Sequence, residues 1–285
     1  MLFRSLFTSD SPIVSQSSAG VGEYNDLTLD AGISSIAFNA TIGAAACDIA
    51  NLGSLVIEEA DAGVFFGQAD TATTGGTGPV GGMFVNGSLD FGSGSNVIGG
   101  ADIVLDGGTG TLTIQTDGGS LRFNGIVTLG SAVILDTDCD DNNSQGGTIT
   151  FTNDAPINSA AGESNNFTLD AGTASIVFNA NNGAAQAIGI FTVEEADAGL
   201  TFGGADTATA GTGSTGPVTT INTDGAIDFG SQDVITGTGI IFNGGAAELT
   251  IQTSGDSVRI NGATTLNTDV RIDLGTGATG KSILF

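Results

Sequence analysis

Short runs of alternating apolar and polar residues recur along the whole chain. They are bounded by Gly, Asn, Asp or Ser, and no apolar stripe of helical spacing has useful length. Alternation with a period of two predicts strands, so the pattern indicates an all-β protein. The clearest runs are LTL at 27–29, IAF at 36–38, LVI at 55–57, VFF at 64–66, LDF at 89–91, IVL at 103–105, LTI at 112–114, LRF at 121–123, VTL at 127–129 and VIL at 133–135.

One long passage occurs twice. The segment LTLDAGISSIAFNA at 27–40 returns as FTLDAGTASIVFNA at 167–180, and other equivalent positions follow at offsets of 136 to 140. Drifting offsets place insertions in turns while the strands are kept, which is typical of a repeat array. We therefore predict a single β-solenoid over residues 1–285, composed of two internal copies at 7–150 and 151–285.

The spacing of the runs suggests how the solenoid is wound. Strand starts 6 to 10 residues apart give three short strands per coil and a coil of roughly 20 to 27 residues. Roughly 11 to 14 coils, stacked at about 4.8 Å, predict a rod on the order of 60 Å long. In this arrangement Leu27, Leu29, Ile36 and Phe38 point inward, and Thr28 and Ala37 point outward.

Phe-Asn pairs mark the ends of four strands. We expect Phe to fill the core and Asn to form the turn, because Asn tolerates a left-handed backbone and can bond to the next coil. A competing fold is a pair of antiparallel sandwiches of about 140 residues. The absence of Trp, the single Tyr and the lack of a linker near 146–151 argue against it. The pairs are Phe38-Asn39, Phe123-Asn124, Phe178-Asn179 and Phe242-Asn243.

Composition narrows the function classes. The 285 residues include 47 Gly, no His and no Trp, and 5 Lys plus Arg against 31 Asp plus Glu give a net charge of −26. Such a surface repels phosphate backbones and anionic lipids, so we expect no nucleic-acid partner, and it attracts cations such as Ca²⁺. No apolar run approaches the roughly 20 residues of a membrane-spanning helix, so no membrane insertion is expected. Without His, a Ser-His-Asp or Cys-His device is impossible, so we expect no enzyme activity.

The segment MLFRSLF is too short for a signal peptide. The export signal is therefore expected outside this sequence, or the export route is not written in it. The two cysteines, Cys47 and Cys139, have no metal-ligand spacing. Three states stay open for them: inert thiols, a disulfide between chains, or a bridge within the chain.

Two acidic motifs are candidates for chemistry. The loop DTDCDDNN places Asp136, Asp138, Asp140 and Asp141 in a D-x-D-x-D arrangement that arrays oxygen ligands, and it is the candidate Ca²⁺ site. The second copy lacks this loop. Paired carboxylates in the turn EEADAG, at Glu58-Glu59 and Glu194-Glu195, would suit a glycosidase. Because both copies keep that turn, we interpret it as a solvated turn.

The strings LTLDAG, IVFNA, LTIQT and GGTITFTNDAPINS extend over essentially the whole chain. They resemble the β-strand repeats of large secreted bacterial surface proteins, of the filamentous-haemagglutinin and autotransporter-adhesin kind. The resemblance implies a right-handed parallel β-helix, a bacterial extracellular or cell-surface location, and a structural or adhesive role in an adhesin, sheath or filament. It carries no catalytic residue over to this chain.

Two further functions remain as alternatives: a carbohydrate-active β-helix such as a lyase, hydrolase or tailspike, and a Ca²⁺-dependent binding module. For the structural role, an uncapped solenoid exposes unpaired backbone and its apolar column at each end. We therefore expect the chain to associate with itself head to tail, through end strands that hold Leu6 and Phe7 at one end and Ile283 and Phe285 at the other. Surface glycans or other cell-surface components are the other expected partners.

Overall fold

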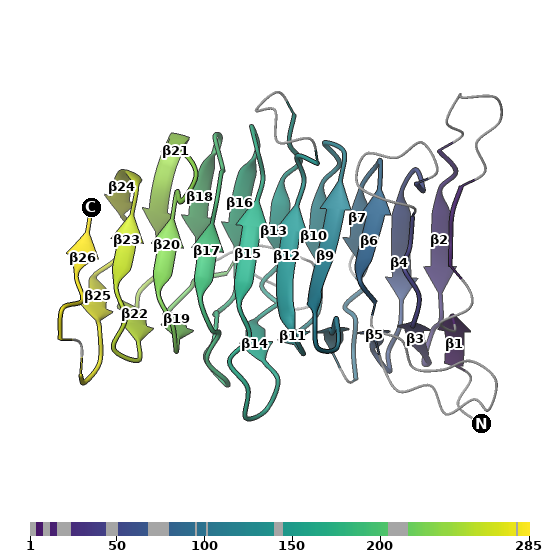
Figure 1. The fold of residues 1–285 in the computed structure, drawn as a ribbon, viewed down its shortest axis with the longest axis horizontal. Coiled ribbons are helices and arrows are strands. Elements are labelled where there is room, and N and C mark those ends of the chain that lie inside the picture. Colours follow the sequence, from purple (N-terminus) through teal and green to yellow (C-terminus); the bar gives the residue numbers. More distant parts are fainter. Residues whose placement is uncertain are drawn as a thin grey trace.

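A computed structural model describes residues 4–7, 12–15, 24–43, 51–67, 80–94, 96–100, 102–139, 145–204, 216–277 and 279–285. Across these residues the secondary structure is β-strand without helix, and the strands of each sheet pair in parallel. Successive strands lie side by side along the long axis, with the two ends of the chain at opposite ends of the stack (Figure 1). The all-β prediction is confirmed, and the architecture is a parallel β-helix.

Sheet 1 consists of a six-stranded part and a three-stranded part, which parallel bridges from Ile157 to Asn182 and from Asn182 to Ile221 connect. Its strands are β1 (Arg4–Phe7), β3 (Ser35–Phe38), β5 (Val64–Phe66), β8 (Ile103–Leu105), β11 (Val127–Leu129), β14 (Ile157–Ser159), β19 (Thr220–Thr223), β22 (Leu249–Thr253) and β25 (Val270–Asp273).

Sheet 2 has eight strands, and single bridges at Ile13 and Ile42 extend it toward the first coil. Its strands are β6 (Gly82–Val85), β9 (Thr111–Thr116), β12 (Ala132–Asp136), β15 (Phe167–Asp170), β17 (Phe191–Val193), β20 (Ile227–Phe229), β23 (Val258–Ile260) and β26 (Ile283–Leu284).

Sheet 3 has nine strands in one continuous ladder. They are β2 (Leu27–Asp30), β4 (Leu55–Glu59), β7 (Leu89–Phe91), β10 (Leu121–Phe123), β13 (Ile149–Phe151), β16 (Ser175–Phe178), β18 (Gly199–Phe202), β21 (Ile235–Phe242) and β24 (Gly262–Leu266).

The chain visits sheets 1, 2 and 3 in turn, so each coil has three sides, as predicted. The expected 11 to 14 coils are wrong, because the longest described sheet has nine strands. At about 4.8 Å per strand, that sheet is roughly 40 Å long. The coils are fewer because some are long: Val64 pairs with Ile103, 39 positions further on, whereas Ile251 and Ile272 are 21 apart.

Stacked phenylalanine rings form the centre of the core. Phe7, Phe38 and Phe66 stack beneath sheet 1 at centroid distances of 5.2 Å. A longer stack beneath sheet 3 runs through Phe91, Phe123, Phe151, Phe178, Phe202 and Phe242 at 4.9 to 5.5 Å. In-register parallel strands place each ring directly over its equivalent in the next coil, which is why Phe recurs at strand ends.

The inward and outward positions follow the predicted alternation with one exception. Ile36 and Phe38 are fully buried, Leu27 and Leu29 pack partly against the core, and Thr28 is exposed. Ala37 is also fully buried, so the expectation that it faces solvent is wrong. Its register partner Phe65 projects from the same outer face of sheet 1 and is itself 7% exposed, so this face carries an apolar patch.

Equivalent residues of the two predicted copies lie on different sheets. Phe38 is in β3 of sheet 1, whereas Phe178 is in β16 of sheet 3. The two strands are fourteen strand positions apart, counting the single bridge at Ile42, and fourteen is not a multiple of three. The second copy is therefore turned by one side of the coil relative to the first. The copy boundaries at 7–150 and 151–285 stay a prediction.

Candidate functional site

The acidic loop singled out in the sequence begins at the end of β12. Asp136 is the register partner of Gln115 on β9 and of Asp170 on β15. The Nε2 of Gln115 donates to Oδ2 of Asp136, and the backbone N–H of Asp138 donates to Oδ1 of the same carboxylate at 2.8 Å. Carboxylates of adjacent coils therefore lie one above another at this corner of the solenoid.

Asp170 is the most perturbed titratable group at this corner. Its residue is 4% exposed, and Oδ1 accepts one hydrogen bond from the N–H of Gly172 at 2.8 Å. Burial, together with the nearby carboxylates of Asp136, Glu195 and Glu194, raises the pKa of Asp170 to about 7 against the opposing bond from the N–H of Gly172. The fold therefore favours the protonated form of this side chain.

Only part of the candidate Ca²⁺ site lies within the described residues. Asp138 is 3% exposed, and Asp140 and Asp141 lie outside the described residues. Within the described part of the chain, no group of three or more His, Cys, Asp or Glu side chains is arranged to hold a metal ion. Binding of Ca²⁺ by Asp136, Asp138, Asp140 and Asp141 stays a prediction.

The two EEADAG turns have different surroundings. Glu58 is exposed and Glu59 half-buried at the end of β4, but Glu195 is 4% exposed. The solvated-turn interpretation is therefore wrong for the second copy. Its turn follows sheet 2 instead of sheet 3, but the backbone bond is the same in both copies: the N–H of Ala171 donates to the carbonyl of Glu195 at 3.0 Å, and the N–H of Ala31 donates to the carbonyl of Glu59 at 2.9 Å. The backbone of the turn therefore does not explain the different burial.

Cys139 takes part in a disulfide bond, and Cys47, the other cysteine of the chain, lies outside the described residues. Cys139 is thus not an inert thiol, which was one of the three states left open by the sequence.

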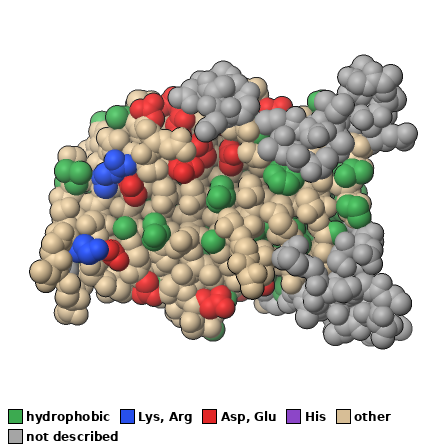
Figure 2. Space-filling view, viewed as in Figure 1, with side chains coloured by type: hydrophobic (Ala, Val, Ile, Leu, Met, Phe, Trp, Pro, Cys, Tyr) green, Lys and Arg blue, Asp and Glu red, His purple; other side chains and the backbone are tan. Residues whose placement is uncertain are grey.

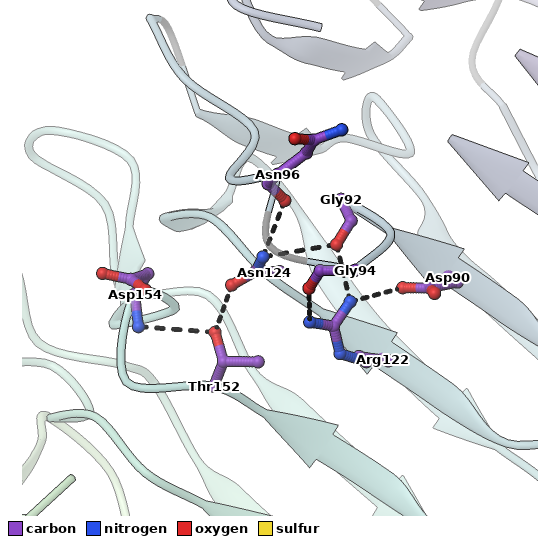
Figure 3. A network of polar contacts seen from close by, with 8 residues as sticks. All are labelled: Asp90, Gly92, Gly94, Asn96, Arg122, Asn124, Thr152 and Asp154. Atoms are coloured by element: carbon purple, nitrogen blue, oxygen red, sulfur yellow. Dashed lines mark hydrogen bonds and ion pairs between the residues drawn. The ribbon is translucent and has the colours of Figure 1, made fainter. Parts of the chain in front are cut away.

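A polar network around Arg122 connects neighbouring coils (Figure 3). Its guanidinium donates to Oδ1 of Asp90 at 2.8 Å and to the carbonyls of Gly92 and Gly94 at 2.6 and 3.1 Å. In the second copy, Arg259 contacts Asp228 at 2.6 Å and the carbonyl of Gly230 at 2.9 Å. The same clamp occurs twice and its donors are used by the protein itself, so its role is to hold turns.

Asn124 extends this network, as expected for the Phe-Asn pairs. Its Nδ2 donates to the carbonyls of Asn96 and Gly92 at 2.7 and 3.2 Å, and its Oδ1 accepts from Oγ1 of Thr152 at 2.8 Å (Figure 3). The expected left-handed backbone is not found at these Asn residues. Among described residues other than Gly, only Asp102 has a positive φ, at 73°. Bonding to both neighbouring coils is sufficient reason for Asn at this position.

The other basic side chains with a described environment are also paired. Arg271 contacts Asp273 and Lys281 contacts Asp256, both at 2.5 Å. On the face shown in Figure 2, acidic side chains are scattered and the few basic ones lie beside acidic ones. No helix long and apolar enough to cross a membrane occurs among the described residues.

The last coil has an apolar cavity of about 230 Å³. Leu266 and Phe285 at its rim are 58% and 73% exposed, and Ile283 and Leu284 are 42% and 56% exposed. Among the described strands, β24, β25 and β26 are each the outermost of their sheets. The cavity is lined by Phe242, Ile260, Thr264, Leu266, Val270, Ile272 and Phe285.

Phe285 at this cavity and the nearby Ile283 are residues predicted from the sequence, whereas Leu266, Val270 and Ile272 are not. Their signal was the alternation in TTLNTDVRIDL, which repeats the strand pattern of the inner coils. At the opposite end, Phe7 and Ile13 are partly buried hydrophobic residues that pack against the core, and Leu6 lies in β1.

Comparisons of the chain with protein-family models, with curated proteins and with solved structures find no match.

Proposed function

We propose that this protein is a non-enzymatic structural or adhesive β-solenoid that stacks head to tail. It would be a subunit or segment of a bacterial surface adhesin, sheath or filament, as the resemblance to the filamentous-haemagglutinin and autotransporter-adhesin kind implies. The observation that carries the proposal is the apolar last coil, where three outermost strands surround a cavity of about 230 Å³.

The two ends of the described solenoid are complementary. The outermost strands of sheet 3 are β2 at one end and β24 at the other, and those of sheet 1 are β1 and β25. The strand edge at one end of each sheet can therefore pair with the opposite edge of the same sheet in a second copy. An outermost strand leaves N–H and C=O groups unpaired, and another parallel strand satisfies them. Contact between unlike ends is heterologous and propagates into an open filament instead of closing into a dimer.

The occupant of the last coil is the first coil of a second copy. That coil offers the partly buried hydrophobic residues Phe7, Ile13, Leu27 and Leu29. Stacking would shield the exposed apolar side chains of the last coil. A net charge of −26 opposes lateral association of flanks, and screening by salt weakens that repulsion, so filaments lengthen as the salt concentration rises.

An extracellular location and the absence of enzyme activity belong to the same proposal. A chain without His lacks the commonest general base, and the described Arg and Lys side chains are paired with carboxylates. The paired clamps and stacked rings serve rigidity, which suits a structural element.

The test is assembly of the 285-residue chain, followed by sedimentation and electron microscopy at increasing concentration. We expect rods that lengthen with concentration and with salt. Leu266→Asp combined with Phe285→Asp should leave single particles, because a carboxylate in each edge position would be buried without a partner. The matched control is Val234→Asp on the flank, where the side chain is 46% exposed and assembly should continue. A native chain that stays monomeric near 100 μM contradicts self-stacking and favours coverage by further polypeptide.

A further inference from the structure

The corner between sheets 2 and 3 has a cleft of about 380 Å³ in the first coils. Tyr24, the only Tyr of the chain, stands at this cleft with 48% of its surface exposed. Two carboxylates and an amide accompany it. The described lining residues are Tyr24, Asp26, Gly53, Ser54, Asn86, Gly87 and Asp117.

The second copy contains the same corner, which provides an internal comparison. In the first copy the N–H of Ser54 donates to Oδ1 of Asp26 at 2.8 Å, and in the second the N–H of Ile190 donates to Oδ1 of Asn166 at 2.9 Å. Backbone bonds repeat as well, from Gly53 to the carbonyl of Asn25 at 2.9 Å and, in the second copy, from Gly189 to Asn165 at 2.8 Å. The two corners thus share one backbone arrangement.

The side chains at the two corners differ in a consistent way. In the second copy Asp224 is bridged by two hydroxyls: Oγ of Ser254 donates to its Oδ1 at 2.9 Å, and Oγ of Ser164 donates to its Oδ2. This polar bridge spans several coils and satisfies its own members. The equivalents in the first copy are Tyr24 for Ser164, Asn86 for Asp224 and Asp117 for Ser254.

The first copy has lost that bridge. Oδ1 of Asn86 is buried and accepts no hydrogen bond, whereas the equivalent Asp224 accepts two. A buried acceptor without a partner is rare in folded proteins and calls for an explanation. Here the flanking hydroxyls have been replaced by an aromatic ring and a carboxylate, and the cleft opens where the bridge would lie.

A row of serine hydroxyls leads away from the cleft. The N–H of Ser88 donates to Oγ of Ser54 and the N–H of Ser120 donates to Oγ of Ser88, both at 3.2 Å, so one serine follows another in successive coils. In the second copy Ile190 and Ala226 stand where Ser54 and Ser88 stand here. The hydroxyl row is therefore also particular to the first copy.

We propose that this cleft binds a neutral saccharide unit. The exposed ring of Tyr24 presents a flat apolar face for the C–H face of a sugar ring. Carboxylates of Asp26 and Asp117 accept hydrogen bonds from sugar hydroxyls, and each has room for more than one. Ser54 adds a hydroxyl at the entrance of the row.

The charge of the lining residues argues against anionic ligands, and the number of carboxylates argues against a divalent metal. An anionic sugar, sulfate or phosphate would meet two carboxylates and no cationic side chain among the described lining residues. A divalent metal needs more hard ligands than two carboxylates supply, and no metal-holding group of three is present in the described ranges. Hydroxyl donors on an uncharged ring fit the acceptors and the aromatic face together.

A saccharide site specifies the partner of the proposed adhesive function, and this proposal rests on that function only for the kind of partner. Stacking involves the end coils through Leu266 and Phe285, so the Leu266→Asp, Phe285→Asp chain is used here as a non-assembling background. Loss of stacking and loss of sugar binding are then separate results.

Sugar binding can be followed through the fluorescence of Tyr24. Because the chain has one Tyr and no Trp, emission excited at wavelengths that its 16 Phe do not absorb reports on this ring alone. Titration with methyl α-D-glucopyranoside and N-acetylglucosamine should change the emission saturably in the millimolar range. Glucuronate and choline, as anionic and cationic probes, should bind at least tenfold more weakly. Tighter binding of choline or glucuronate than of every neutral sugar, or no response to any probe, would overturn the proposal.

Variants locate the site. Asn86→Asp with Asp117→Ser reproduces two members of the second-copy bridge and should weaken sugar binding at least tenfold while the circular dichroism spectrum stays native. The matched control is Asp224→Asn, the corresponding change at the closed corner, which should leave the dissociation constant unchanged. For Tyr24→Ala, saturation-transfer NMR of the sugar replaces fluorescence and should show no transfer. Unchanged binding in either first-copy variant would contradict the assignment.

Discussion

Replacing Phe178 by Ala tests the stacked core directly. Its side chain is fully buried, and its ring stacks on Phe151 and Phe202 at centroid distances of 4.9 Å, with interplanar angles of 1° and 4°. A third ring, Phe191, meets its edge at 5.7 Å. Truncation therefore removes one large side chain and three aromatic contacts from a closely packed column.

The magnitude follows from these contacts. Truncating a buried Phe to Ala costs about 3 to 5 kcal/mol, including the cavity left behind. Aromatic pairs contribute about 0.5 to 1.5 kcal/mol each beyond burial, so three pairs place Phe178 at the upper end of that range, near 5 kcal/mol. Because whole domains are stable by about 5 to 15 kcal/mol, this variant should lose about a third or more of the free energy of unfolding at 25 °C.

The assay is urea unfolding followed by circular dichroism, with the urea dependence of the free energy compared between variants. Phe178→Leu is the matched control, because it keeps more of the volume and loses the three ring contacts, and it should cost about 1.5 to 3 kcal/mol, less than the Ala variant. A loss well under 1 kcal/mol for the Ala variant would show that the register is wrong. Equal losses for Ala and Leu would show that volume contributes nothing and would refute the packing argument.

Two further predictions use a buried acid and a stacked turn. Burial raises the pKa of Asp170 from 3.8 to about 7, so its contribution to stability is fully present below pH 3.8 and is lost as the pH rises through 7. Asp170→Asn should therefore raise the urea midpoint most at pH 8, less at pH 5, which lies between the two pKa values, and least below pH 3.8; an equal change at pH 8 and below pH 3.8 would contradict the assignment. A Cβ added at Gly119 would lie 2.1 Å from the carbonyl oxygen of Gly87 in the next coil, whereas one at Gly81 meets nothing within 4 Å. Gly119→Ala should cost more than about 2 kcal/mol and Gly81→Ala under about 0.5 kcal/mol in the same assay, and similar costs would disprove the close approach of these coils.

The strands and the core were largely predictable because both depend on local alternation. Each of the ten runs identified in the sequence falls within a described strand, and the Phe of all four Phe-Asn pairs is buried in the core. The strand β6 was missed, since GMFV has Gly and Met where other strands have branched residues. Its inward Met83 and Val85 are nevertheless buried.

The number of coils and the side occupied by each strand were not predictable, because both depend on how long each turn is. A coil of 39 residues between Val64 and Ile103 has the same height as one of 21. Local sequence also gives no sign of whether a motif meets a carboxylate in the next coil, as Glu195 does near Asp170. The cleft at Tyr24 had a readable signal, the exchange of Ser164, Asp224 and Ser254 for Tyr, Asn and Asp, but its meaning required the hydrogen bonds of the second copy.

A copy length of fourteen strand positions has a consequence for surface function. Because each copy turns the pattern by one side of the coil, any feature kept in both copies appears on two different faces, as the clamps of Arg122 on sheet 3 and Arg259 on sheet 2 do. Side chains that hold the fold can occur on any of the three sides, since every coil needs them. A ligand site has no such need to recur on a second face, so we expect a recognition surface at exposed corners where the side chains of the two copies differ. The corner at Tyr24 and Asp117 is such a place, with the shared backbone kept and the side chains exchanged.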